Sequence, residues 1–173
     1  MRATIHLGVG DIVESSSELL RWVIILSTLG SGMMAGLFVA FSTFIMRALG
    51  SIPNGEGMRA MQAINRFIIR PSFLIVFLGT GALLIAACVL VDNSHPSFLF
   101  LVLATLAYVV ACLISTITFN VPLNNKLDEL DSESSEGIEF WQQYLVTWTR
   151  WNHVRSIACI AATILLALAS FRL

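Results

Sequence analysis

Charged residues are scarce in this chain. Of its 173 residues, 12% are Asp, Glu, Lys or Arg, while 57% are hydrophobic. Soluble domains carry about 25% charged residues, because their surface must be hydrated. The formal net charge of −1 also offers no basic surface for nucleic-acid phosphates. The composition argues against a soluble globular enzyme, a disordered chain and a nucleic-acid-binding protein, and it indicates an integral membrane protein.

Charge is almost absent from four long stretches of the sequence. A transmembrane helix needs roughly 20 predominantly apolar residues. The stretches that approach or exceed this length lie at about residues 20–46, 72–91, 98–119 and 154–171. The last one is short, and we expect a cytoplasmic helical extension over about 138–153 to precede it. We therefore predict an all-α fold, an integral membrane four-helix bundle that forms a single domain over residues 1–173.

Proline is also rare, with four in the chain. Pro122 follows the third stretch, where its missing N–H should kink or stop the helix. Between the first two stretches, residues at about 55–70 place Met58 and Met61 on one face of a helix and arginines on another. We predict a short amphipathic helix there. Asn65 lies beside its apolar face, so its side chain points either into the bundle or toward solvent.

The basic residues are unevenly distributed. Seven of the ten lie in the segments 47–71 and 120–155. The positive-inside rule places these segments in the cytoplasm and both termini outside it. We expect a multi-pass protein of the bacterial inner membrane. Gly32 and Gly36 form a GxxxG motif that could mediate a homo-oligomer, although contact with another helix of the same chain is the simpler interpretation.

Metal ligands are sparse as well. The chain has no Glu-x-x-His motif and no carboxylate within the four stretches, which a di-iron bundle or a proton-coupled carrier would need. Of the three histidines, only His153 falls on the side of the membrane that holds the basic segments. The three cysteines lie in different stretches, without a CxxC pair. We therefore expect no metal site and no cofactor.

Polar and aromatic residues gather near the start of the fourth stretch. On a helix, Trp148, Asn152 and Arg155 share one face, at spacings i, i+4 and i+7. An interfacial aromatic belt with arginines that reach the head groups would explain the tryptophans. Such a belt requires neither polar residues on the tryptophan face nor the nearby amides of Asn120 and Asn124. A polar pocket at one end of the bundle is the other interpretation, and the residues alone leave both open.

Four blocks of sequence carry a family resemblance. They lie at residues 36–49, 60–65, 120–125 and 148–155, and the last two read NVPLNN and WTRWNHVR. Together, over about residues 20–171, they resemble the anthrone oxygenase-like family of small four-helix membrane proteins. The resemblance implies oxidation of an anthrone to an anthraquinone with molecular oxygen. The family often has a proline where this chain has Arg47, so we expect the first helix to continue past that position.

The resemblance also implies roles for individual residues. We expect a membrane-embedded oxygenase or oxidase whose partners are a lipophilic aromatic molecule, oxygen and membrane lipid. His153 or a bound water would accept the substrate proton, and Arg155 with Arg150 would stabilise the resulting oxyanion. The other candidate residues would orient the substrate or stack on its rings: Asn65, Asn120, Asn124, Asn152, Trp148 and Trp151. The alternative is a non-catalytic membrane protein that binds a lipophilic ligand or a partner.

Overall fold

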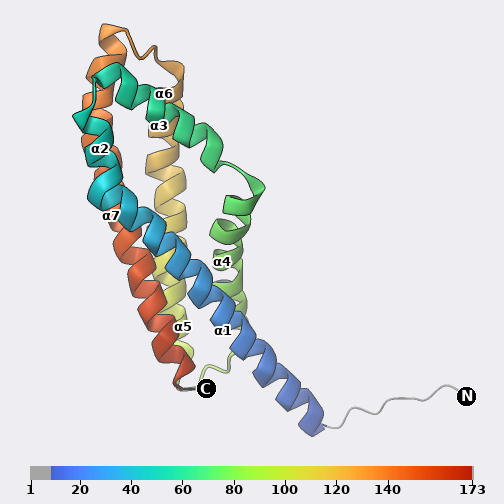
Figure 1. Cartoon of the computed structure of the whole chain (residues 1–173). Coiled ribbons are helices and arrows are strands. Elements are labelled where there is room, and N and C mark those ends of the chain that lie inside the picture. The colour runs from blue at the N-terminus through green and yellow to red at the C-terminus, as the bar shows by residue number, and fades with distance from the viewer. Residues whose placement is uncertain (1–8, 173) are drawn as a thin grey trace, which may run out of the picture.

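Every regular element that the structure describes is a helix. The computed structural model describes residues 9–172, with side chains from residue 17 onward, and that range contains no strand (Figure 1). Four helical stretches are long and apolar enough to cross a membrane: Ser17–Ser51, Pro71–Leu90, Phe98–Glu129 and Ser135–Ser170. The predicted all-α fold with four membrane spans is confirmed, and it is the fold of a multi-pass membrane protein.

Some of the four stretches are built from several helical segments. The first comprises α1 (Val9–Ala40) from Ser17 onward, the π-helical η1 (Phe41–Ile45) and α2 (Met46–Ser51). It continues past Arg47, as expected. The chain then forms α3 (Asn54–Ile68) and α4 (Pro71–Leu90). The third stretch combines α5 (Phe98–Thr105), η2 (Leu106–Ile114), η3 (Thr116–Asn120) and α6 (Val121–Glu129), and the fourth is α7 (Ser135–Ser170).

Pro122 does not stop the third stretch. The stretch changes to π-helical turns in η3 and then resumes as α6, which has Pro122 in its first turn. A proline in an α-helix interior removes one hydrogen bond and collides with the preceding turn. The wider turn of a π-helix changes which backbone groups bond to each other at this point, and the first turn of a helix accepts proline. The helix therefore carries Asn124 and its neighbours on to Glu129.

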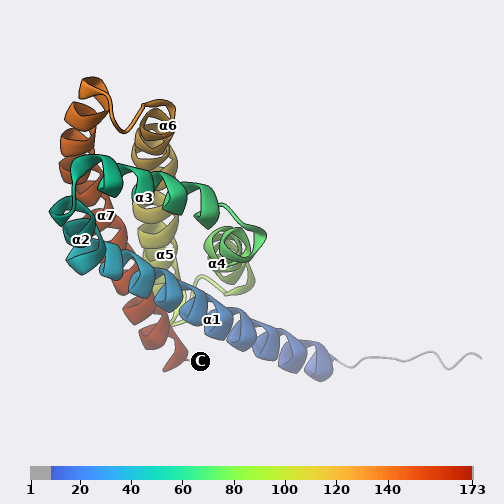
Figure 2. The same ribbon diagram turned by 45° about the horizontal axis from the view of Figure 1, so that its top comes forward.

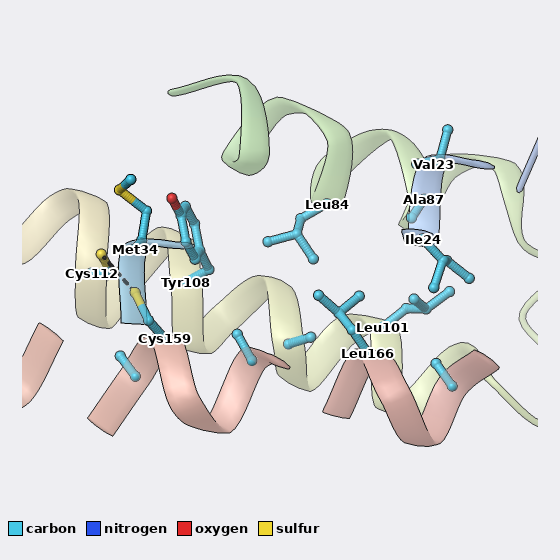
Figure 3. Packing of buried hydrophobic residues seen from close by; sticks show 14 of the residues in the cluster. Val23, Ile24, Met34, Leu84, Ala87, Leu101, Tyr108, Cys112, Cys159 and Leu166 are labelled. Atoms are coloured by element: carbon cyan, nitrogen blue, oxygen red, sulfur yellow. Dashed lines mark hydrogen bonds between the residues drawn. The ribbon is translucent and has the colours of Figure 1, made fainter. Parts of the chain in front are cut away.

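The core is formed by contacts of α1 with α7 and α4, and of α5 and η2 with α7. Leu84, Leu101 and Leu166 are fully buried where α4, α5 and α7 meet (Figure 3). Cys112 and Cys159 are free thiols that lie side by side, with their sulfur atoms 3.4 Å apart (Figure 3). These cysteines pack in the core and do not form a disulfide.

The GxxxG motif lies partly at the α1–α7 contact. A Cβ atom at Gly32 would lie 3.9 Å from the Thr163 side chain of α7, whereas one at Gly36 would have nothing within 4 Å. Gly32 therefore contributes to packing within the chain, and a homo-oligomer through this motif stays a prediction. The orientation of the protein in the membrane also stays a prediction, because the length and composition of the four stretches do not distinguish the two sides of a bilayer. Residues 1–8 and 173 lie outside the described range.

Helix α3 crosses one end of the bundle, opposite the end where α1 begins and α7 finishes (Figures 1 and 2). Its Met58 and Met61 are buried against the bundle. The Gln62 side chain donates to the backbone carbonyls of Leu127 and Leu130, at 2.8 and 3.0 Å. Arg66 forms an ion pair with Asp128 of α6, at 2.7 Å. These contacts hold α3 against α6 and the loop that follows it.

Gly57 allows the close approach of α3 to α2. A Cβ atom there would collide with the backbone carbonyl of Leu49 and lie 3.2 Å from the ring of Trp141. We expect Gly57→Ala to lower the free energy of unfolding by about 1–3 kcal/mol, because overpacking forces the backbone to move. The measurement is thermal unfolding of the purified protein. Gly79→Ala is the matched control, since that position has open space and alanine favours helix by about 1 kcal/mol. Equal losses in both variants would contradict this account.

Candidate functional site

A cavity of about 350 Å³ lies between α3, α4, α7, the α1–η1 junction and the η3–α6 segment. Ligand pockets in proteins have volumes of roughly 300–1,000 Å³. Most of its lining is aliphatic or aromatic, and the polar or charged residues on it are Asn65, Thr116, Asn124 and Arg155, with the indole of Trp148. An apolar space with a few polar groups is the usual composition of a small-molecule site.

Aromatic rings form much of the cavity wall. Phe73 and Phe77 of α4 are stacked with centroids 5.2 Å apart, and Phe38 of α1 meets Phe77 edge-on at 6.3 Å. Phe41 and Trp148 also line the cavity, with ring centroids 5.5 Å apart. Flat aromatic faces attract other planar rings through offset stacking and edge contacts. The wall therefore suits a planar aromatic ligand.

Arg155 is a buried cation that lines this cavity. Only 4% of its surface is exposed, and its guanidinium lies between the rings of Phe38 and Trp148, at 4.6 and 4.8 Å from their centroids. Its Nη2 donates to Asn152 Oδ1 at 2.9 Å, while its buried Nε has no hydrogen-bond partner. Among residues 17–172, no carboxylate pairs with it. Because a buried charge without a counter-charge is costly, this arrangement favours an anionic group of a ligand beside Arg155.

Asn152 holds the guanidinium in place. It is fully buried, and its Nδ2 donates to the backbone carbonyl of Phe38 and to Ser42 Oγ, both at 2.7 Å. Phe38 lies one turn before η1, where the backbone changes from α- to π-helical hydrogen bonding. Short π-helical segments are frequent at functional sites. The amide thus ties α7 to this junction in the first stretch, while its Oδ1 orients Arg155.

A second set of amides surrounds Tyr144. Asn124 Oδ1 accepts hydrogen bonds from the Tyr144 hydroxyl at 2.7 Å and from Trp148 Nε1 at 2.8 Å. Asn65 Nδ2 donates to the same hydroxyl at 3.4 Å. Asn120 is buried behind this group, where its Nδ2 donates to the Trp148 carbonyl at 3.3 Å and its Oδ1 has no partner. The network fixes the Trp148 ring at the cavity wall.

Comparison with known protein families assigns the chain. The sequence model of the anthrone oxygenase family matches residues 66–165, which is more than half of the chain. The chain belongs to the anthrone oxygenase family. The matched region includes α4, α6 and the part of α7 that carries Trp148, Asn152 and Arg155. It is narrower than the predicted resemblance, because it leaves out the first stretch and Asn65. Searches of curated proteins and of solved structures found no match.

In this anthrone oxygenase family member, six of the nine predicted site residues come together. Asn65, Asn124, Trp148 and Arg155 line the cavity, and Asn120 and Asn152 are buried beside it. The structure resolves the open question about Asn65, since its side chain points into the bundle and is only 8% exposed. Of the two interpretations that the residues left open, the geometry supports a pocket.

The other three predicted residues lie elsewhere. His153 is exposed and lines a separate, more open depression of about 390 Å³ together with Arg47 and Thr149. Arg150 is exposed, and the Trp151 ring stacks on Phe119 outside the cavity, with centroids 3.6 Å apart. Within the part of the chain that the structure describes, no three His, Cys, Asp or Glu side chains converge.

Sequence reasoning missed Tyr144 as a member of the site. Its hydroxyl joins Asn65 of α3 to Asn124 of α6, and its ring stacks between those of Trp141 and Trp148. The signal was present, because Trp141, Tyr144 and Trp148 are spaced at i, i+3 and i+7 on one face of a helix. Only the neighbouring helices show that this aromatic face borders amides.

Proposed function

We propose that this protein is a membrane-embedded oxygenase or oxidase that converts a lipophilic aromatic substrate of the anthrone type with molecular oxygen. The observation that carries the proposal is the aromatic-walled cavity, in which Arg155 is buried without a carboxylate partner among residues 17–172. Membership of the anthrone oxygenase family supports an oxygenase-like role and suggests the substrate class.

The chemistry requires an anion to form and to persist. Loss of a proton from the anthrone methylene gives a carbanion that is delocalised onto the carbonyl oxygen on the opposite side of the central ring, as a phenolate-type anion. Arg155 would hold this oxyanion, as preorganised charges do in oxyanion sites. The electron-rich anion can then transfer an electron to oxygen. Overall, one anthrone and one O₂ give one anthraquinone and one water, so one oxygen atom enters the new carbonyl and the other leaves as water.

The proton acceptor in this proposal is water. None of the described residues that line the cavity is a histidine or an acid, and His153 lines a different depression. A neighbouring cation favours the ionised form of an acid, so Arg155 would make the bound anthrone more acidic. Asn65 would orient the substrate, because its amide lines the cavity and bonds only to Tyr144 among the described side chains.

The test of the proposed function is oxidation of a hydroxyanthrone by the purified protein in lipid nanodiscs under ¹⁸O₂. We expect the quinone to form faster than in empty nanodiscs and to carry one ¹⁸O atom in its new carbonyl. A rate equal to that of spontaneous oxidation would overturn the proposal. Saturable binding of the hydroxyanthrone without turnover would instead favour the alternative, a non-catalytic protein that binds a lipophilic ligand.

The variant His153→Gln separates two routes for the substrate proton. Loss of a general base normally costs about 10²–10⁴-fold in rate. Because His153 lies outside the cavity, we expect a much smaller change in kcat for anthrone oxidation. Glutamine keeps the polarity and approximate size of the side chain, so that the exposed depression is little disturbed. A loss of about 10²–10⁴-fold in kcat would instead support His153 as the acceptor of the substrate proton, the role that the sequence resemblance implied.

A further inference from the structure

We infer that the cavity exchanges its ligand directly with the bilayer, through a lateral opening between α4 and the η3–α6 segment. The inference rests on the proposed function only for the identity of the ligand, since the opening would serve any lipophilic molecule that fits the cavity. It concerns the route to the cavity, which lies outside the chemistry proposed above.

Three sides of the cavity are closed by buried residues. Phe38 of α1 is 4% exposed, Met61 of α3 is 1% exposed and Trp148 of α7 is 5% exposed. Helix α3 covers the end of the bundle, and the hydrogen bonds of Gln62 to the carbonyls of Leu127 and Leu130 hold it there. These contacts cover most of the α3 end of the cavity, and the exposed lining residue at this end is Ile69, in the short connection between α3 and α4.

The fourth side is open along the surface of the spanning helices. Leu78 of α4 is 50% exposed, Ile117 of η3 is 62% exposed and Val121 of α6 is 39% exposed, yet all three line the cavity. The cavity and the outer surface therefore meet at these residues. Both views of the fold show α4 lying apart from α6 (Figures 1 and 2). Leu78, Ile117 and Val121 form the rim of this opening. Leu78 and Ile117 belong to two stretches that are apolar enough to span a membrane, so the rim faces acyl chains.

The rim also selects the form of the ligand. Leu78, Ile117 and Val121 are aliphatic, so they offer no hydrogen bond and no charge to a molecule that passes between them. A neutral planar molecule dissolved in the bilayer can enter without exposing its apolar surface to water, which would cost about 25 cal/mol per Å². An ionised molecule would have to give up its hydration in the hydrocarbon region. The ligand thus enters neutral, and in an anthrone the proton is lost only beside Arg155.

Narrowing of the rim tests this route. The variant is Leu78→Phe combined with Ile117→Phe, and the matched control is Ile75→Phe combined with Ile114→Phe. The control residues lie on the same two membrane stretches and are 70% and 50% exposed, but they do not line the cavity. The probe is 1,8-dihydroxyanthraquinone, which cannot be oxidised at the former methylene. Stopped-flow quenching of tryptophan fluorescence measures its transfer from preloaded vesicles to the protein in nanodiscs.

We expect the narrowed variant to bind and release the probe roughly tenfold more slowly, with an equilibrium affinity close to that of the wild type, because a barrier on the route changes both rates together. The control variant should exchange the probe at wild-type rates. The double variant Leu78→Ala with Ile117→Ala widens the rim and should accelerate both binding and release of the probe. This variant tests the inference if the bulky variant does not fold.

Unchanged rates in the narrowed variant would overturn the inference. A loss of affinity through faster release alone would overturn it too, because that result means the new rings only fill the binding space. The measurement follows binding and not oxidation. Slowed exchange in a protein without oxygenase activity would therefore refute the proposed function and leave the lateral opening intact.

Discussion

Arg155→Met is expected to remove most of the anthrone oxidation while the protein remains folded. Among the described residues, the guanidinium is the only charged group that lines the cavity, so its loss leaves the developing oxyanion without a counter-charge. Removal of one oxyanion donor costs about 10²–10³-fold in kcat in well-studied enzymes. Methionine is apolar, flexible and long enough to occupy the space between Phe38 and Trp148.

The same substitution should change stability little. Replacing a buried charge by an apolar residue of similar volume is often neutral or stabilising by about 1–4 kcal/mol. Against this gain, the Oδ1 of Asn152 loses its hydrogen bond from Arg155, which costs about 1–3 kcal/mol. We therefore expect thermal unfolding near the wild-type temperature together with a loss of activity.

Two measurements check the role of Arg155. Initial rates with a hydroxyanthrone give the loss in kcat, and binding of a hydroxyanthraquinone is compared with binding of unsubstituted anthracene. The affinity loss should be confined to the ligand that can present an anionic oxygen. Arg21→Met is the matched control, because Arg21 is exposed at the other end of the bundle and pairs with Glu18. Wild-type activity in Arg155→Met would refute the oxyanion role.

Asn152→Leu is expected to cause the largest loss of stability. Asn152 is fully buried, its amide donates to the Phe38 carbonyl and to the partly buried Ser42, and its Oδ1 accepts from Arg155. Leucine has a similar size but leaves the carbonyl and the cation without these partners. An unsatisfied buried polar group costs about 1–3 kcal/mol, and a charged one more, so we expect a loss of about 3 kcal/mol or more.

Asn125→Leu provides the matched control for this loss. Asn125 is exposed on α6, so the same change there should alter the free energy of unfolding by less than about 0.5 kcal/mol. Unfolding in a denaturing detergent titration compares the two variants with the wild type. Asn152→Leu should also reduce the rate of anthrone oxidation, because Arg155 loses the contact that orients it. Similar stabilities for the two variants would mean that the hydrogen bonds at Asn152 contribute little.

The shared face of Trp148, Asn152 and Arg155 was predictable from their spacing. All three lie in α7, and the helical period places them together whatever surrounds the helix. The helical period does not identify which residues of other helices this face contacts. Asn152 is bonded and buried because Phe38 and Ser42 of the first stretch approach it, whereas His153, one residue along and about 100° around the helix, points into a different depression.

The inward position of Asn65 could not be decided from its segment alone. It lies at the edge of the apolar face of α3, where a small rotation of the helix would expose it. The contacts of Gln62 and Arg66 with α6 and the following loop set that rotation, and the partners of these two residues lie more than 60 positions away in the chain. Contacts between residues so distant in sequence leave no periodic signal.

Two features could be read from the sequence without the fold: that the chain is a four-span helical membrane protein, and that the polar groups of α7 share one face. Both follow from composition and from the helical period, which are properties of contiguous residues. The packing of the helices was needed to show that Arg155 lacks a carboxylate partner among residues 17–172 and that aromatic rings enclose a cavity with Leu78 and Ile117 at its exposed edge. These features depend on how α1, α3, α4 and α6 pack around α7, and packing joins residues that the sequence keeps far apart.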